Sequence, residues 1–326
     1  MPEFPKTVSA PWQAYYDRAR DPALTPPTPA PDDLAGWARA QQAIDAPMLA
    51  VTEEALKSYA GHVFDRQIDG VPVVEVHPVA RTPGRGAIVY VHGGAYTLYS
   101  AKARLTSALP VADRTGTPVI AVDYALAPAA RWPTALDQVV AVIGGLVRER
   151  RGPVVLYGDS AGGALAVAAT LKMRGLGLAL PKALVLWSPW SDIDAVGDSY
   201  ATLADADTSF RYDRHLANAA LAYADRDRHR DPLVSPVYGD FAPGFPPTLI
   251  QGGTREIFLS NFVRLYRALV GAGQRAILDL YEGMPHAFQA YPAQTGSSES
   301  RAALDATAAF LVEHLRPPAR RIRQSS

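Results

Sequence analysis

PVVLYGDSAGGALAVAATLKM, residues 153–173, decides the fold of this chain, because a buried strand, a sharp turn and a helix follow one another without a gap. "PVVLY" is an apolar run typical of a strand covered on both faces, and "ALAVAATLKM" favours a helix. Between them Gly158-Asp159-Ser160-Ala161-Gly162 fits G-x-S-x-G, whose glycines permit a strained turn that holds a serine oxygen clear of the sheet. The stretch predicts an α/β architecture and a nucleophilic Ser160.

Ser160 has a simpler interpretation, as a helix N-cap beside glycines that permit close packing. A nucleophile, unlike a cap, needs hydrogen-bond donors for the oxyanion it creates and a base for its proton. Donors are found upstream, where His92-Gly93-Gly94-Ala95 follows the apolar run "AIVYV". We expect the backbone amides of Gly93, Gly94 and Ala95, together with that of Ala161, to form the oxyanion hole.

The base is expected to be a histidine, because an imidazole changes charge near neutral pH without a large pKa shift. On α/β-hydrolase sheets the chain order is serine, acid, histidine, which excludes the three histidines that precede Ser160: His62, His77 and His92. His314 is expected at a helix end, and His215 and His229 on the solvated surface of a charged stretch. His286 in "LDLYEGMPHAFQAY" remains as the expected base.

The acid should lie between the serine and the histidine, at the end of a strand. Glu256 follows the apolar run "TLIQ" and precedes His286 by 30 residues. Asp192 and Asp194 follow "ALVLWSPW" and are rivals, and Asp279 lies within a strand pattern. The residues alone leave Glu256 and the two rivals open.

Apolar runs alternate with helical stretches over most of the chain, and two segments depart from this pattern. "HVFDRQI" and "VPVVEVHPV" flank Asp69-Gly70, a hairpin signal, and the later alternation predicts a mainly parallel sheet with helices on both faces. Residues 51–191 and 236–317 are assigned to this core. Residues 1–50, rich in Ala, Pro and aromatics, and the charged block 192–235 are expected to cover it, and 318–326 to be a frayed tail.

Composition limits the choice of partners. Among 326 residues, 32 Lys and Arg balance 32 Asp and Glu, so no net field attracts nucleic acid or an anionic membrane surface. The absence of cysteine excludes disulfides, thiolate zinc sites and a cysteine nucleophile. The sequence contains neither a signal-like leader nor an apolar run near membrane-spanning length, so we expect a cytoplasmic protein.

With these residues assembled, the chain resembles the hormone-sensitive-lipase-like branch of the α/β-hydrolases. The resemblance covers most of the chain and rests on "HGGAY", "VDYALAPAARWPTALDQ", "GDSAGG", "SPW", "DPLVSPVYGDF" and "MPHAF". It implies an eight-stranded, mainly parallel sheet with a helical cap, and ester hydrolysis by a triad of Ser160, Glu256 and His286. The chain departs from the family in its HGGA loop, where HGGG is usual, in "ALAPAAR", and in a glutamate where many members have aspartate.

The expected activity is carboxylester hydrolysis on short to medium acyl esters of small molecules, with no metal and no organic cofactor. Tyr96, Trp190 and Phe210 are expected to contact substrate, and aromatic residues of the cap suggest an apolar wall. Two other functions stay open: hydrolysis of lactones, amides or acetyl groups by the same residues, and a catalytically silent small-molecule-binding protein. A homodimer through the edge strand near 277–281 is implied by the resemblance alone.

Overall fold

A central sheet crosses the computed structural model, which describes residues 3–82, 86–149, 152–242 and 244–315. Its strands in these residues are β1 (His62–Ile68), β2 (Val71–His77), β3 (Ala87–Val91), β4 (Val119–Val122), β5 (Val154–Asp159), β6 (Leu184–Trp187), β7 (Thr248–Gly253) and β8 (Ala276–Tyr281). Their order across the sheet is β1-β2-β4-β3-β5-β6-β7-β8. β2 pairs antiparallel with both of its neighbours, and all other pairs are parallel. The prediction of an eight-stranded, mainly parallel sheet is confirmed.

The turn between β1 and β2 confirms the hairpin signal in the sequence. Ile68 pairs with Val71, which leaves Asp69 and Gly70 as a two-residue loop. Both loop residues have positive φ, 49° and 78°, as a type I′ turn requires. At the other edge lies β8, where the homodimer contact was expected, and that contact stays a prediction.

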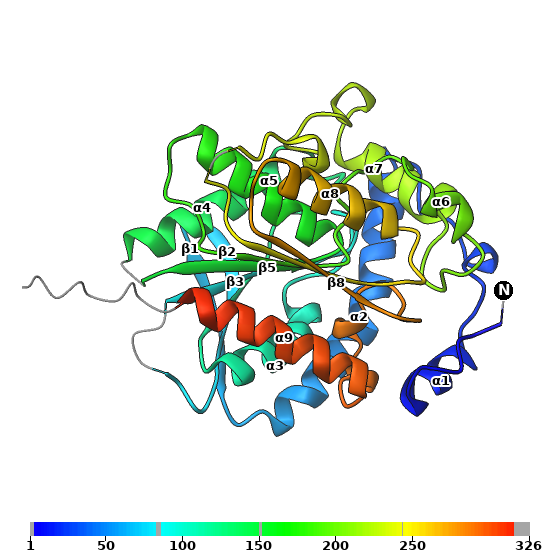
Figure 1. Ribbon diagram of the computed structural model, residues 1–326, viewed down its shortest axis with the longest axis horizontal. Coiled ribbons are helices and arrows are strands. Elements are labelled where there is room, and N and C mark those ends of the chain that lie inside the picture. Colours follow the sequence, from blue (N-terminus) through cyan, green and yellow to red (C-terminus); the bar gives the residue numbers. More distant parts are fainter. Residues whose placement is uncertain (1–2, 83–85, 150–151, 243, 316–326) are drawn as a thin grey trace, which may run out of the picture.

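Helices cover both faces of the sheet (Figure 1). The helices in the described residues are α1 (Ala10–Tyr16), α2 (Leu34–Ser58), α3 (Leu105–Thr115), α4 (Thr134–Arg148), α5 (Ala161–Gly175), α6 (Ser199–Thr202), α7 (Ala217–Tyr223), α8 (Leu259–Gly271) and α9 (Ser298–Leu315). α4, α5 and α8 pack on the face that carries Val89 and Val91, whereas α3 and α9 pack on the face that carries Ile88 and Tyr90. The strands are therefore apolar on both sides, which is why they appear in the sequence as unbroken apolar runs.

The N-terminal segment and the block 192–235 pack against each other above the sheet. Trp37 of α2 forms a buried cluster with Ala219 and Ala222 of α7. The amide of Thr28 donates to the carbonyl of Arg214 at 2.8 Å. The domain boundary placed at residue 50 falls inside α2, which continues to Ser58 although it contains a proline. The expected tail 318–326 lies outside the described residues.

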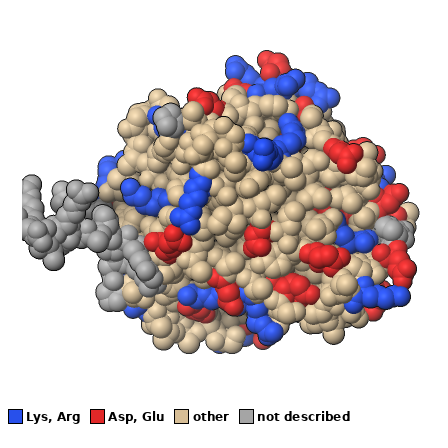
Figure 2. Space-filling model, in the orientation of Figure 1, with Lys and Arg blue, Asp and Glu red and all other residues tan. Residues whose placement is uncertain are grey.

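The surface is of mixed charge. Basic and acidic side chains both occur across the face drawn in Figure 2, in keeping with the equal numbers of the two in the chain. Within the described residues, every helix is too short or too polar to cross a lipid bilayer.

Parallel strands place the chemically interesting segments at one edge of the sheet. The HGGA loop follows β3, Ser160 follows β5, Glu256 follows β7 and His286 follows β8. β3 pairs directly with β5, with Val91 opposite Gly158. Because carboxyl ends of parallel strands share an edge, segments far apart in sequence converge there.

Candidate active site

Ser160 lies on a strained turn between β5 and α5. Its φ of 55° is rare for a residue with a side chain, and its amide donates to the carbonyl of Trp187 at 2.8 Å. The flanking glycines are required because a side chain at either position would clash with neighbouring backbone atoms. A Cβ at Gly162 would lie 2.1 Å from the carbonyl oxygen of Val91, and one at Gly158 would lie 2.6 Å from the backbone of Gly162. The glycines of G-x-S-x-G thus allow the turn after β5 to approach the end of β3.

The HGGA loop supplies free amides beside this turn. Gly94 and Ala95 have φ of 110° and 52°, and both line the cavity that also contains Ser160. The amides of Gly94, Ala95 and Ala161 donate to no other residue in the described part of the chain. Gly93 does not fit the expectation of an oxyanion donor, because its amide already donates to Asp159 Oδ1 at 3.0 Å. The amides of Gly94, Ala95 and Ala161 are therefore the candidate oxyanion donors.

Asp159 anchors the HGGA loop to the turn that carries Ser160. This carboxylate is 3% exposed and accepts from the Tyr90 hydroxyl at 2.7 Å, from Gly93, and from Arg104 Nη2 at 3.1 Å. Burial and the nearby carboxylate raise the pKa of Tyr90, so its hydroxyl stays a donor. Asp159 was visible in the G-x-S-x-G motif, but its partners come from other elements, so its role was missed.

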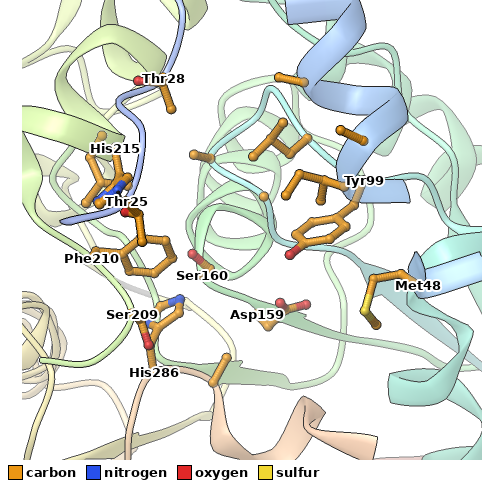
Figure 3. Close-up of a pocket in the computed structure, with 18 of the residues that line it drawn as sticks. Thr25, Thr28, Met48, Tyr99, Asp159, Ser160, Ser209, Phe210, His215 and His286 are labelled. Atoms are coloured by element: carbon orange, nitrogen blue, oxygen red, sulfur yellow. Dashed lines mark hydrogen bonds between the residues drawn. The ribbon is translucent and has the colours of Figure 1, made fainter. Parts of the chain in front are cut away.

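His286 and Glu256 form a buried pair. The ring Nδ1 of His286 lies 2.7 Å from Glu256 Oε2, and the two residues are 6% and 0% exposed. Because a carboxylate is an acceptor, Nδ1 carries the proton and Nε2 is left as the basic nitrogen. His286 and Ser160 line one cavity, and Figure 3 shows their side chains close together there. Phe210 and Phe258 face the ring edge-on at 5.0 and 4.9 Å between centroids, which limits its orientation.

Ser188, at the end of β6, holds both members of this pair in place. Its hydroxyl donates to Glu256 Oε1 at 2.8 Å and accepts from the amide of Ala287 at 2.9 Å. The amide of Gly253 also donates to Glu256 Oε1, at 2.5 Å. Glu256 is therefore held by contacts from the ends of β6 and β7 and from the loop that carries His286. The sequence analysis did not single out Ser188, and its "SPW" motif was the available signal.

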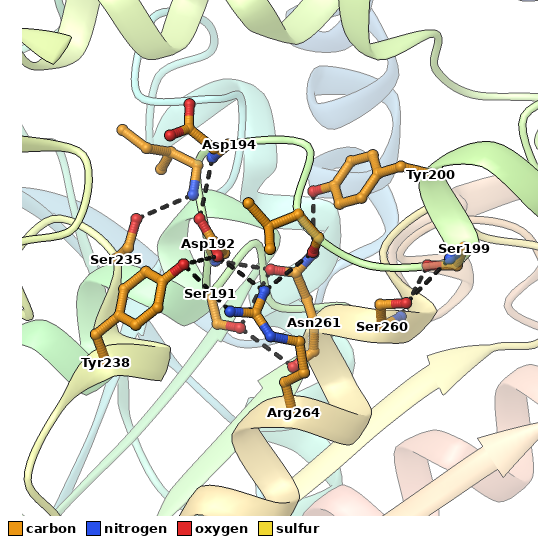
Figure 4. Close-up of polar contacts among 12 residues, drawn as sticks. Ser191, Asp192, Asp194, Ser199, Tyr200, Ser235, Tyr238, Ser260, Asn261 and Arg264 are labelled. Atoms are coloured by element: carbon orange, nitrogen blue, oxygen red, sulfur yellow. Dashed lines mark hydrogen bonds and ion pairs between the residues drawn. The ribbon is translucent and has the colours of Figure 1, made fainter.

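The carboxylates of Asp192 and Asp194, the rival candidates for the triad acid, contact other residues, and Figure 4 shows the contacts of Asp192. Asp192 Oδ2 accepts from Arg264 at 2.8 Å and from the Tyr238 hydroxyl at 2.7 Å. Asp194 pairs with His229, whose Nδ1 lies 2.8 Å from its carboxylate. The structure brings Glu256 to His286. It also corrects the expectation for His229, which is 1% exposed because the charged block folds back on itself.

The cavity above Ser160 has a volume of about 680 Å³ and an apolar wall. Its wall comes from the segment around Thr25–Pro29, one face of α2, Leu98, Phe210 and the loop after His286. His215 also lines it, contrary to the expectation of a solvated position, and burial lowers the pKa of its imidazole. This volume is within the usual range for small-molecule sites.

Of the three aromatic residues expected to contact substrate, Phe210 lines the cavity. Tyr96 and Trp190 do not, because both are buried against other rings. Tyr96 stacks on Tyr223 with centroids 3.7 Å apart, and Trp190 stacks on Phe258 at 5.9 Å. The aromatic content of the cap therefore serves packing as well as the cavity wall.

Asp207 connects the block 192–235 to the loop after β7 that carries Glu256. Its buried carboxylate accepts from the amides of Ile257 at 2.8 Å, Ser209 at 2.7 Å and Phe210 at 3.2 Å. Burial raises the pKa of Asp207 to about 6. These contacts set the position of Phe210 relative to the neighbouring Glu256.

Comparisons with known proteins agree with this geometry. Residues 88–290 match the family described as the alpha/beta hydrolase fold. An acetyl-hydrolase of Streptomyces hygroscopicus is 35% identical over 241 residues, which cover 71% of this chain and 77% of that protein. The crystal structure of the esterase E25 is 30% identical, with a TM-score of 0.89 and 97% of each chain covered. An esterase of the bacterial hormone-sensitive lipase family is 28% identical, with a TM-score of 0.82 over 97% of this chain and all of that one.

The chain belongs to the α/β-hydrolase family, in its hormone-sensitive-lipase-like branch. It is an enzyme of the esterase class.

Proposed function

We propose that this enzyme hydrolyses carboxylic esters through a triad of Ser160, His286 and Glu256. The observation that carries the proposal is the 2.7 Å contact between the fully buried Glu256 and His286, which lines the same cavity as Ser160. A structural serine at a helix start would need neither an oriented imidazole nor a cavity.

In the acylation step, Nε2 of His286 takes the proton of Ser160 while the serine oxygen attacks the ester carbonyl. Glu256 holds the ring in the required tautomer and stabilises the imidazolium without taking the proton itself. The amides of Gly94, Ala95 and Ala161 donate to the oxyanion, and the N-terminus of α5 adds its positive dipole end. The imidazolium then protonates the departing alcohol.

Deacylation uses the same groups in reverse roles. His286 takes a proton from water, the resulting nucleophile attacks the acyl-serine, and the same amides stabilise the second oxyanion. The bond between the acyl carbon and the Ser160 oxygen then breaks, the imidazolium returns its proton to that oxygen, and the carboxylic acid leaves. The buried Asp159 network keeps the HGGA loop in place through both steps, because it ties that loop to the Ser160 turn.

The substrates we propose are short to medium acyl esters of small molecules. An apolar cavity of about 680 Å³ supports this range, and Ala95 places a methyl group beside the oxyanion, which narrows the space there. A second candidate is removal of acetyl groups from a small molecule. It is favoured by the similarity to the Streptomyces acetyl-hydrolase and to an ethyl acetate hydrolase of Pseudomonas putida, which is 31% identical over 216 residues.

A panel of 4-nitrophenyl esters from acetyl to hexadecanoyl separates these candidates. We expect kcat/KM to peak between butanoyl and octanoyl and to fall about tenfold or more at hexadecanoyl, because a cavity of about 680 Å³ gives an extended long acyl chain little room. A peak at acetyl with a steep fall by butanoyl favours the second candidate. Matched lactone and anilide substrates belong in the same panel, and faster turnover of either would contradict ester hydrolysis as the main reaction.

A further inference from the structure

Tyr99 has a backbone conformation that ordinarily selects glycine. Its φ is 69°, in the left-handed region that bulky side chains rarely adopt. Glycine populates that region without steric cost, whereas a tyrosine there is strained, and such strain points to a functional role for its side chain. The residue lies four positions after Ala95 of the HGGA loop and lines the cavity with Ser160.

The ring of Tyr99 is held by Arg104. The guanidinium carbon lies 5.0 Å from the ring centroid, and Nη2 of the same group donates to Asp159 at 3.1 Å. Arg104 is 9% exposed, so neither partner can easily reorient. This contact accounts for an aromatic ring at position 99 but not for its hydroxyl, because phenylalanine would offer the cation a similar face.

The Tyr99 hydroxyl points into the cavity (Figure 3) and bonds to no other residue in the described part of the chain. Two other hydroxyls of the wall already have hydrogen-bond partners. The hydroxyl of Thr25 lies 2.7 Å from the His215 ring, and that of Thr28 donates to a backbone carbonyl at 3.2 Å. Ser209 also lines the cavity, and its hydroxyl is buried. Tyr99 thus presents an unpaired hydroxyl to a mainly apolar cavity.

The position of Tyr99 indicates which part of an ester would meet it. His286 must protonate the departing alcohol, so the alcohol lies on the side of His286 and Phe210. Figure 3 shows Tyr99 and Met48 on the other side of Ser160. The acyl group extends to that side.

Building on the proposed function, we propose that Tyr99 is a specificity-determining residue whose hydroxyl donates a hydrogen bond to an oxygen atom in the acyl chain. The preferred substrate class is then esters of alkoxy, hydroxy or oxo acids, and not of plain fatty acids. A hydroxyl held at a fixed point favours substrates that present an acceptor there, because an unpaired polar group in an apolar site is unfavourable.

The test compares Tyr99→Phe with the unmodified enzyme on matched esters. The measured quantity is the ratio of kcat/KM for 4-nitrophenyl methoxyacetate to that for the butanoate, and for the 4-oxopentanoate to that for the hexanoate. We expect at least one ratio to fall about three- to tenfold in Tyr99→Phe, the usual effect of losing one neutral hydrogen bond. Dividing kcat/KM for one ester by kcat/KM for its counterpart cancels any general change in activity. Tyr59→Phe is the control, because Tyr59 is a tyrosine outside the cavity wall whose hydroxyl donates to the carbonyl of His77.

Two outcomes would overturn the proposal. In the first, both ratios are the same in Tyr99→Phe as in the unmodified enzyme. In the second, these ratios are unchanged, and Tyr99→Phe alters only the ratio of kcat/KM for a methoxyethyl ester to that for a butyl ester, in which the oxygen lies in the alcohol group. Both are distinct from failure of the proposed function, in which the unmodified enzyme would hydrolyse none of these esters.

Discussion

Ser160→Ala should lower kcat for ester hydrolysis by about 10⁴- to 10⁶-fold, because the nucleophile of a triad acts as a unit with its base. The residual rate would come from the oxyanion amides and binding. Alanine keeps the backbone conformation available to serine at this turn, so the fold should persist. The measurement is steady-state kinetics on a short acyl ester with protein of verified folded content.

Ser58→Ala is the matched control for this variant. Ser58 ends α2, its exposed hydroxyl donates to the carbonyl of Ala55, and it is absent from the cavity wall. Its kcat should equal that of the unmodified enzyme. A Ser160→Ala enzyme with kcat within about tenfold of the unmodified value would refute the assignment of the nucleophile.

Glu256→Gln is expected to produce the second largest effect, a fall in kcat of about 10³- to 10⁴-fold. Glutamine preserves the shape of the side chain but removes the charge that stabilises the imidazolium, and its amide can hold the ring in the wrong tautomer. The loss should appear in kcat and not mainly in KM, because Glu256 contacts His286 and does not line the cavity.

Asp192→Asn tests the rival acid. Asp192 is buried and pairs with Arg264 and Tyr238, so its replacement should lower the melting temperature. The kcat of the folded fraction should change little. If Asp192→Asn abolished turnover while Glu256→Gln retained it, the acid would be misassigned.

The features that could be predicted from the sequence are those that local pattern and chain order determine. Unbroken apolar strands, the Asp69-Gly70 turn and the glycines around Ser160 each follow from a short segment. His286 was found by elimination, because few histidines follow the serine. Glu256 needed the family resemblance, since three carboxylates between Ser160 and His286, those of Asp192, Asp194 and Glu256, follow an apolar strand pattern.

The features that were missed depend on pairings between distant segments. Ser188 contacts Glu256 68 residues away, and Asp159 accepts from Gly93 66 residues away, so neither role is visible in a local motif. The same limit explains Tyr96, whose ring was expected to meet substrate. Tyr96 has a positive φ, and this backbone conformation directs its ring onto Tyr223 at the end of α7.

The most direct test of the central claim is the site of covalent modification by a fluorophosphonate, located by mass spectrometry of the digested protein. Only a serine that is activated by a base and an oxyanion hole reacts rapidly with such a reagent. We expect one adduct per chain, on Ser160, with no adduct in Ser160→Ala and slow labelling in Glu256→Gln. Absence of labelling in the unmodified, folded enzyme, or an adduct on a different residue, would contradict the account and would favour a silent binding protein or another nucleophile.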